Sequence, residues 1–136
     1  MQASRLMLER LKVLSARNMD FAFETTLAAR SFAKFLKQCK RNGYKINLFY
    51  VWLNSQGLAV ARVSRRVASG GHDIPIDIIT RRYERGKKNF VKLYSPIADR
   101  WIAYDNSNQR QKIAEKPLNQ AVTIYQPRIW QQIITD

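Results

Sequence analysis

Helix-length and strand-length apolar segments alternate along this chain of 136 residues, which predicts an α/β fold. The length fits one domain with a modest core. Hydrophobic residues make up 46% of the chain and recur periodically, which favours a globular protein despite the high charge. We therefore expect a parallel sheet with flanking helices.

Four segments carry apolar residues at helical spacing. The first runs from Ser4 to Ala16, and the second from about Ala29 to Cys39, closed by Asn42 and Gly43. The third spans Gln56–Ala68 and ends at two glycines. The fourth begins near Pro75 and stops before Pro96, with Gly86 inside it as a candidate kink or flexible joint.

Strand patterns lie between these helices. Residues Phe21–Phe23 form a short apolar run that ends at Glu24. The run Ile46–Leu53 is nearly continuous, which suits a strand covered on both faces. A third strand is expected at Trp101–Tyr104, followed by a turn at Asp105–Ser107. Weaker patterns favour short strands at 112–115 and 121–125 and a final helix at 128–134.

The net charge of +14 is spread evenly along the chain. Residues 1–60 hold ten Lys and Arg against three acids, and residues 61–136 hold fourteen against seven, a net charge of +7 in each case. Such a charge predicts weak, non-specific polyanion binding without choosing among nucleotides and nucleic acids. The one cysteine, Cys39, excludes a disulfide framework and favours a buried thiol.

Membrane and secretion signals are weak in this sequence. The first 20 residues carry charges throughout, unlike a secretory signal, and the longest uncharged apolar run is too short to span a bilayer. We therefore expect a cytoplasmic protein with no membrane partner.

Three separated strings resemble one protein family in order and spacing. They read FAFETTL at Phe21–Leu27, GGHDIPIDIITRRYERG at Gly70–Gly86, and RWIAYDNS at Arg100–Ser107. They are similar to the zeta-toxin-like P-loop kinases, also described as predicted ATPases, over roughly residues 3–115. The resemblance implies a P-loop-kinase-like fold, ATP and Mg²⁺ as cofactors, a nucleotide and a small phosphate acceptor as partners, and a toxin–antitoxin setting.

The phosphate-binding loop of such kinases is not found in the sequence. That loop needs glycines five residues apart, followed by Lys and Ser or Thr. The Gly-Lys pair at Gly86 has Arg81 where the first glycine should stand and Lys88 where Ser or Thr should stand. By resemblance, residues 1–136 are then a single incomplete kinase domain, the C-terminal portion of the family's fold, with its N-terminal strand and P-loop absent.

In the family's fold the strand that feeds the P-loop lies between the strands equivalent to residues 21–24 and 46–53. A vacancy there would leave an apolar strand edge, which invites self-association or an upstream N-terminal segment.

The resemblance implies acceptor-binding roles for Glu24 and Thr26, with Arg30 nearby. Ligands of open α/β sheets bind beyond the carboxyl ends of strands, where Glu24 is expected. A helix N-terminus explains the same residues without a ligand, with Thr25 or Thr26 as the cap. Both interpretations stay open.

A helical lid is expected over residues 56–95, because two arginine-bearing helices flank a glycine-bearing loop. By resemblance Arg66 and Arg82 reach nucleotide phosphates, with Arg62 and Arg81 next. A guanidinium suits phosphate because it donates two parallel hydrogen bonds. A solvated basic face is the alternative. No catalytic residue and no metal ligand can be assigned, and in the loop Asp73 is expected to cap the helix that starts at Pro75.

Two functions from different classes remain. The first is an ATP-dependent kinase that phosphorylates a small acceptor such as a nucleotide sugar, inactive alone because the P-loop and an early catalytic acid are missing. The second is a non-catalytic basic module that binds nucleic acid or other polyanions.

Overall fold

The computed structural model describes residues 2–135 and places their side chains from Arg5 onward. Four strands form one sheet in the order β1-β2-β3-β4. The strands are β1 (Asn47–Trp52), β2 (Arg100–Asp105), β3 (Gln111–Lys116) and β4 (Thr123–Ile124). The α/β fold with flanking helices is thereby confirmed.

Strand directions depend on how the strands are connected. Strands β1 and β2 are parallel and are joined by a long helical crossover, whereas β2/β3 and β3/β4 are antiparallel and joined by short connections. Parallel neighbours need a crossover, while a short turn can only reverse the chain. The sheet is therefore parallel at one pairing and antiparallel at the other two, rather than parallel throughout.

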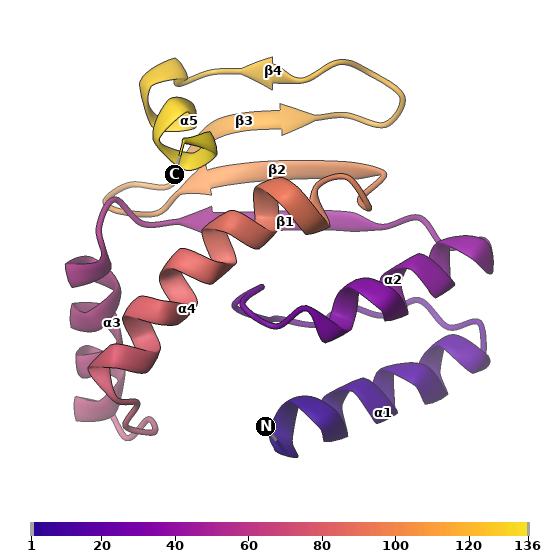
Figure 1. The fold of residues 1–136 in the computed structure, drawn as a ribbon, viewed down its shortest axis with the longest axis horizontal. Coiled ribbons are helices and arrows are strands. Elements are labelled where there is room, and N and C mark those ends of the chain that lie inside the picture. Colours follow the sequence, from indigo (N-terminus) through magenta and orange to yellow (C-terminus); the bar gives the residue numbers. More distant parts are fainter. Residues whose placement is uncertain (1, 136) are drawn as a thin grey trace.

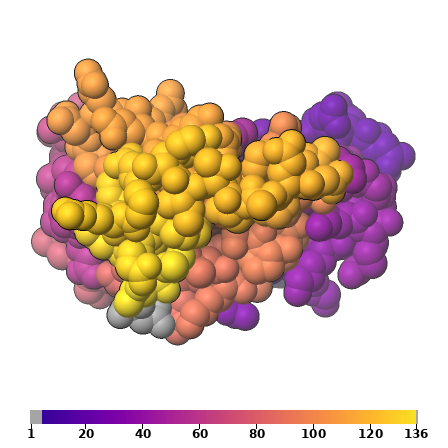
Figure 2. Space-filling view, turned by 90° about the horizontal axis from the view of Figure 1, so that it is seen from above, coloured from indigo at the N-terminus to yellow at the C-terminus, as the bar shows by residue number. Residues whose placement is uncertain are grey.

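The helices lie where their periodicity predicts them. They are α1 (Gln2–Ala16), α2 (Ser31–Arg41), α3 (Gln56–Ala68), α4 (Ile76–Asn89) and α5 (Pro127–Ile134). A π-helical turn, η1 (Phe90–Tyr94), continues α4. In Figure 1, α4 and α5 lie across one face of the sheet, α3 lies beside α4, and α1 and α2 lie beyond the β1 edge. Seen from the β4 side, the N-terminal helices occupy one end of the molecule (Figure 2).

The core is an aromatic cluster between the sheet and the helices on that face. Phe90 is fully buried and stacks on Tyr50 of β1, with ring centroids 4.3 Å apart. It meets Trp101 of β2 edge-on, and Trp101 in turn stacks on Trp130 of α5 at 5.3 Å. Aromatic side chains bury large apolar areas, so this cluster fixes how α4 and α5 sit on the sheet.

The opposite face of β1 corrects an expectation. The strand alternates between buried and exposed residues: Tyr50 and Trp52 face the core, while Phe49 is 63% and Val51 51% exposed. Within the described residues β1 is also an edge strand, because it pairs with β2 alone. It is therefore covered on one face rather than on both.

The strand expected at Phe21–Phe23 is not formed. This stretch is irregular, and its aromatic side chains pack on α2: Phe21 lies 5.9 Å from Phe35, and Phe23 lies 5.1 Å from Phe32, between ring centroids. Cys39 of α2 is buried, as expected. In residues 2–135 there is no helix of sufficient length and apolarity to cross a bilayer.

Asp99 ties the start of β1 to the turn before β2. Its carboxylate accepts a 2.7 Å hydrogen bond from the N–H of Ile46 and lies 3.5 Å from the Lys40 ammonium of α2. Burial acts to raise the pKa of the Asp99 carboxyl, but the Ile46 N–H and the Lys40 charge outweigh it and hold that pKa below its ordinary value.

Replacing Asp99 with alanine is expected to lower the free energy of unfolding by about 1–3 kcal/mol at neutral pH, because the partly buried Ile46 N–H loses its partner. Since the folded pKa is lowered, the Asp99 contribution is complete above the ordinary value near 3.8 and disappears as the pH falls through the folded pKa. Urea denaturation at several pH values measures the difference from wild type. Asp73→Ala, in an exposed loop, is the control. A difference that persists unchanged at low pH would contradict this role.

Candidate phosphate and acceptor site

An open pocket of about 710 Å³ lies beside β1, between α3, α4 and the segment that precedes α2. It brings together most of the residues expected to bind substrates. Five of them line it: Glu24, Thr26, Arg62, Arg66 and Arg82. Tyr50, Val51 and Leu53, at and just after β1, form its floor on the sheet side.

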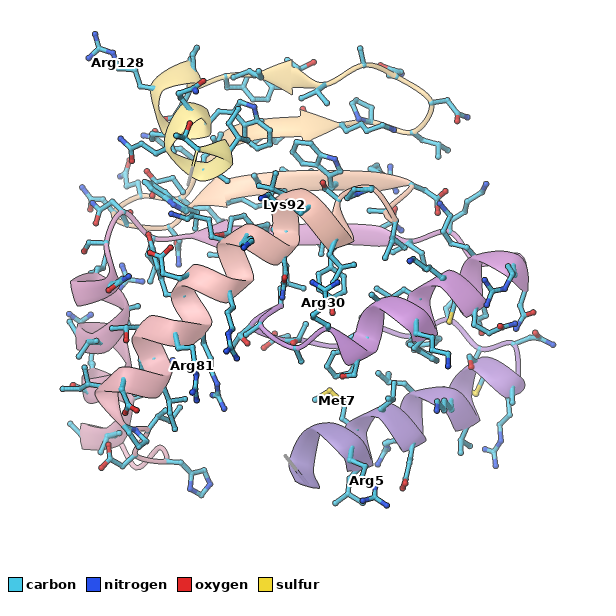
Figure 3. All side chains as sticks on the ribbon, viewed as in Figure 1. Arg5, Met7, Arg30, Arg81, Lys92 and Arg128 are labelled. Carbon is cyan, nitrogen blue, oxygen red and sulfur yellow. The ribbon has the colours of Figure 1, made fainter. Side chains whose placement is uncertain are left out.

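Two expected residues lie outside this lining. Figure 3 shows Arg30 where the chain enters α2 and Arg81 on the first half of α4. Both side chains are exposed. Two further cationic residues, Arg65 and Lys87, were not among the expected phosphate-binding residues and also line the pocket.

The Thr25–Ala28 stretch is a pair of turns rather than a helix cap. The Thr25 hydroxyl accepts from the N–H of Leu27, and the Thr26 hydroxyl accepts from the N–H of Ala28, each at 3.3 Å. Helix α2 begins only at Ser31, and its N-terminus has no side-chain cap. The capping interpretation of Thr25 and Thr26 is therefore wrong. Glu24 and both threonines are exposed at the pocket rim, free to meet a ligand.

Gly86 lets α4 approach this segment closely. A Cβ atom built on Gly86 would lie 2.3 Å from the Thr26 carbonyl oxygen, a distance that no side chain tolerates without movement. Helix α4 runs unbroken through Gly86 to Asn89, so the glycine is not a kink. Its role is to let residues Glu24–Ala28 touch the helix, and we call these residues the acceptor segment after the role that the family resemblance implies.

The next turns of the same helix hold that segment in place. The buried Asn89 amide donates to the carbonyl oxygens of Leu27 and Ala28 at 2.8 and 3.1 Å. Tyr94, in the π-helical turn, donates to the carbonyl of Ala29. Leu27 is buried at φ +63°, a left-handed conformation that such anchoring must support. The contacts of Gly86, Asn89 and Tyr94 with residues 26–29 were not predicted. The one feature of the sequence that pointed to them was a glycine inside a helix.

Of the three expected arginines that line the pocket, one is engaged by other residues and two are available to a ligand. Arg62 donates to the carbonyl oxygens of Asn106 and Ser107 at 2.9 and 3.2 Å, which fixes α3 against the end of β2. The side chains of Arg66 and Arg82 are exposed and have no ion pair or hydrogen bond with other described residues. Two unpaired guanidinium groups on facing helices leave the pocket wall strongly positive.

Two features were expected of the loop between α3 and α4: glycines that end α3, and an Asp73 side chain that caps α4. The first is confirmed and the second is wrong. Gly70 adopts φ +98°, and the Gly71 N–H donates to the Arg66 carbonyl at 2.7 Å, which ends α3. Asp73 does not cap α4, because Pro75 occupies the cap position and has no side-chain bond. The turn after β2 is confirmed, since the Ser107 N–H donates to the Asp105 carboxylate at 2.9 Å.

The pocket does not fit a protein-held divalent cation. No three His, Cys, Asp or Glu side chains gather into a metal-binding group within the described residues. Glu24 supplies a single carboxylate to the pocket lining. Magnesium that is held mainly by substrate phosphates needs one or two protein carboxylates, and Glu24 is the carboxylate that this pocket lining offers.

Comparison with known proteins decides the family. The family model described as "Zeta toxin" matches residues 1–116. The chain belongs to the zeta toxin family. The P-loop-kinase-like fold follows from this membership, and the identification made from the three sequence strings is confirmed.

One curated relative is similar over part of its length. An uncharacterized protein of Haemophilus influenzae is 37% identical over 67 residues, which cover 49% of this chain and 48% of that protein. The match thus spans about half of each chain. No solved structure matches this zeta toxin family member.

Proposed function

We propose that this chain forms the acceptor and lid side of an ATP-dependent phosphotransferase that acts on a small acceptor such as a nucleotide sugar. One observation carries the proposal: a single pocket joins Glu24 and Thr26 to the arginines Arg66 and Arg82. Hydroxyl-binding groups and phosphate-binding groups therefore face the same space.

The two walls of the pocket suit the two halves of a phosphoryl transfer. Arg66 and Arg82 offset negative charge on phosphates, since a guanidinium forms paired, charge-assisted hydrogen bonds. On the other wall, the Glu24 carboxylate accepts hydrogen bonds from acceptor hydroxyls, and the Thr26 hydroxyl adds a further polar contact. Arg30, near the same segment, would meet a more extended acceptor.

ATP would supply the phosphoryl group, while the residues of this chain bind and orient. No residue here is assigned to take the acceptor's proton. Lid arginines cannot replace the backbone donors of a P-loop, which the printed sequence does not contain. The 136 residues by themselves are therefore expected to bind phosphates without consuming ATP.

Titration with ATP and with inorganic tripolyphosphate by calorimetry tests this proposal. We expect weak, salt-sensitive binding to the wild type, a loss of about fivefold or more for Arg66→Ala and for Arg82→Ala, and no ATP consumption. Arg128→Ala is the matched control, because Arg128 is an exposed arginine on α5, remote from the pocket (Figure 3).

One result would overturn the pocket as the phosphate-binding site, and another would overturn the expected lack of ATP consumption. Equal losses for Arg128→Ala and Arg82→Ala would mean that total charge, not the pocket, binds phosphate. Magnesium-dependent ATP consumption that Arg82→Ala abolishes would show that these residues suffice for turnover.

A further inference from the structure

The face of the sheet opposite the helices carries exposed aromatic and cationic side chains. Pairing sets Phe49 opposite Ile102, Val51 opposite Tyr104, and Tyr104 opposite Lys112, so these residues share one face. Phe49 and Val51 are mostly exposed, and Ile102 and Tyr104 are half-buried. This open sheet face, defined by Phe49, Val51, Ile102, Tyr104 and Lys112, lies away from α4 and α5 (Figure 1).

Cations surround the aromatic rings on this face. The Arg110 guanidinium lies 5.5 Å from the centre of the Tyr104 ring, and the Lys112 ammonium lies 6.0 Å from the centre of the Tyr125 ring. Arg100, at the start of β2, is exposed as well. The one carboxylate that pairing places here, Glu115, accepts hydrogen bonds from Tyr125 and Lys112. The face therefore presents rings and positive charge together.

We propose that the open sheet face binds single-stranded nucleic acid. The exposed rings of Phe49 and Tyr125 offer stacking surfaces for unpaired bases, and the neighbouring cations neutralise the phosphodiester backbone. The charge argues against a second protein as occupant, because the buried centre of a protein interface is depleted of charged residues. A duplex fits poorly, since its bases are already stacked and the broad face of a four-stranded sheet cannot enter its grooves.

This surface is distinct in chemistry from the pocket. The pocket is lined by arginines and a carboxylate, whereas the open sheet face presents aromatic rings with cations beside them. Nucleic-acid binding at the open sheet face would also account for a net charge of +14, which is larger than nucleotide binding in the pocket requires.

Fluorescence anisotropy with labelled ten-nucleotide oligouridine and oligothymidine tests the proposal. Phe49→Leu is expected to weaken binding at least fivefold, because base stacking on one ring contributes about 1–3 kcal/mol. Phe49→Trp keeps a ring and is expected to bind as the wild type does. Leu6→Ala, at an equally exposed apolar position on α1, is the control for lost apolar surface.

A second pair of variants separates local from total charge. Arg110→Gln is expected to weaken binding more than Arg128→Gln does at the same salt concentration, since Arg110 lies over Tyr104. Weakening in both Phe49→Leu and Arg110→Gln supports the site, with the two oligonucleotides showing whether it prefers RNA or DNA. The proposal fails if Phe49→Leu binds as Leu6→Ala does, if Arg110→Gln matches Arg128→Gln, or if duplex competes as well as single strands.

Discussion

Replacing Gly86 with alanine is expected to destabilise the protein by up to about 2 kcal/mol and to displace the acceptor segment. The new methyl group would lie 2.3 Å from the Thr26 carbonyl oxygen, so either the segment or α4 must shift. Overpacking of this kind costs about 1–3 kcal/mol. A gain of about 1 kcal/mol in helix propensity offsets it only in part. Urea denaturation measures the stability, and backbone amide chemical shifts of residues 25–28 report the displacement.

Gly57 provides the matched control. A Cβ at Gly57, in the first turn of α3, would have one neighbour within 4 Å, the Ser55 hydroxyl oxygen at 3.8 Å. Gly57→Ala is therefore expected to be neutral or to stabilise the protein by up to about 1 kcal/mol. If both alanine variants were equally stable, the contact between α4 and Thr26 would not be what glycine provides.

Asn89→Ala tests the hydrogen bonds between α4 and the acceptor segment, as Gly86→Ala tests their close packing. It removes the amide that two carbonyls share, those of Leu27 and Ala28, and should likewise perturb the amide shifts of residues 25–28. Agreement between the Gly86 and Asn89 variants would show that α4 positions the acceptor segment while it also carries Arg82. Helix α4 would then connect Arg82, on the proposed phosphate side of the pocket, to Glu24 and Thr26 on the proposed acceptor side.

Periodicity predicted the elements that bury one face against a neighbour. The helices α1, α2, α3 and α5 and the strand β1 formed within a few residues of their expected bounds. Phe21–Phe23 failed for a physical reason. Its apolar residues are satisfied by rings on α2, and a three-residue stretch with no adjacent strand has no ladder to join.

The candidate site was predictable in composition but not in contacts. Family resemblance named Glu24, Thr26, Arg66 and Arg82, and the structure brings them to one pocket. Sequence spacing could not show that Arg62 is engaged by the end of β2, because those carbonyls are more than 40 residues away along the chain. The same holds for the Gly86 contact, which depends on how α4 crosses a distant segment.

Among the described residues, one edge of β1 is unpaired. In the described chain β1 pairs on one side with β2, and its other edge borders the pocket through Tyr50 and Val51. An exposed strand edge of this kind invites pairing with another chain. We expect the isolated 136 residues to be marginally stable and prone to self-association.

A co-expressed polypeptide that supplies a strand and a Gly-rich phosphate loop is expected to convert the protein to a monomeric complex with a higher melting temperature. Burying several apolar side chains, each contributing about 1.5–3 kcal/mol, is large against a total stability of roughly 5–15 kcal/mol. Size-exclusion chromatography and thermal melting measure both effects. The control is the same polypeptide with proline at the centre of its strand, which cannot complete the hydrogen-bond ladder.

The prediction can fail clearly. The isolated chain could run as a monomer, melt cooperatively at about 45–65 °C as ordinary mesophilic domains do, and gain nothing from the added strand. That result would mean that no further strand pairs with β1. The pocket beside this edge would then stay open to solvent in the complete fold. If instead the intact strand stabilises the chain and the proline version does not, backbone pairing at β1 completes the sheet. The Gly-rich loop would then stand next to Arg66 and Arg82, where phosphates are proposed to bind.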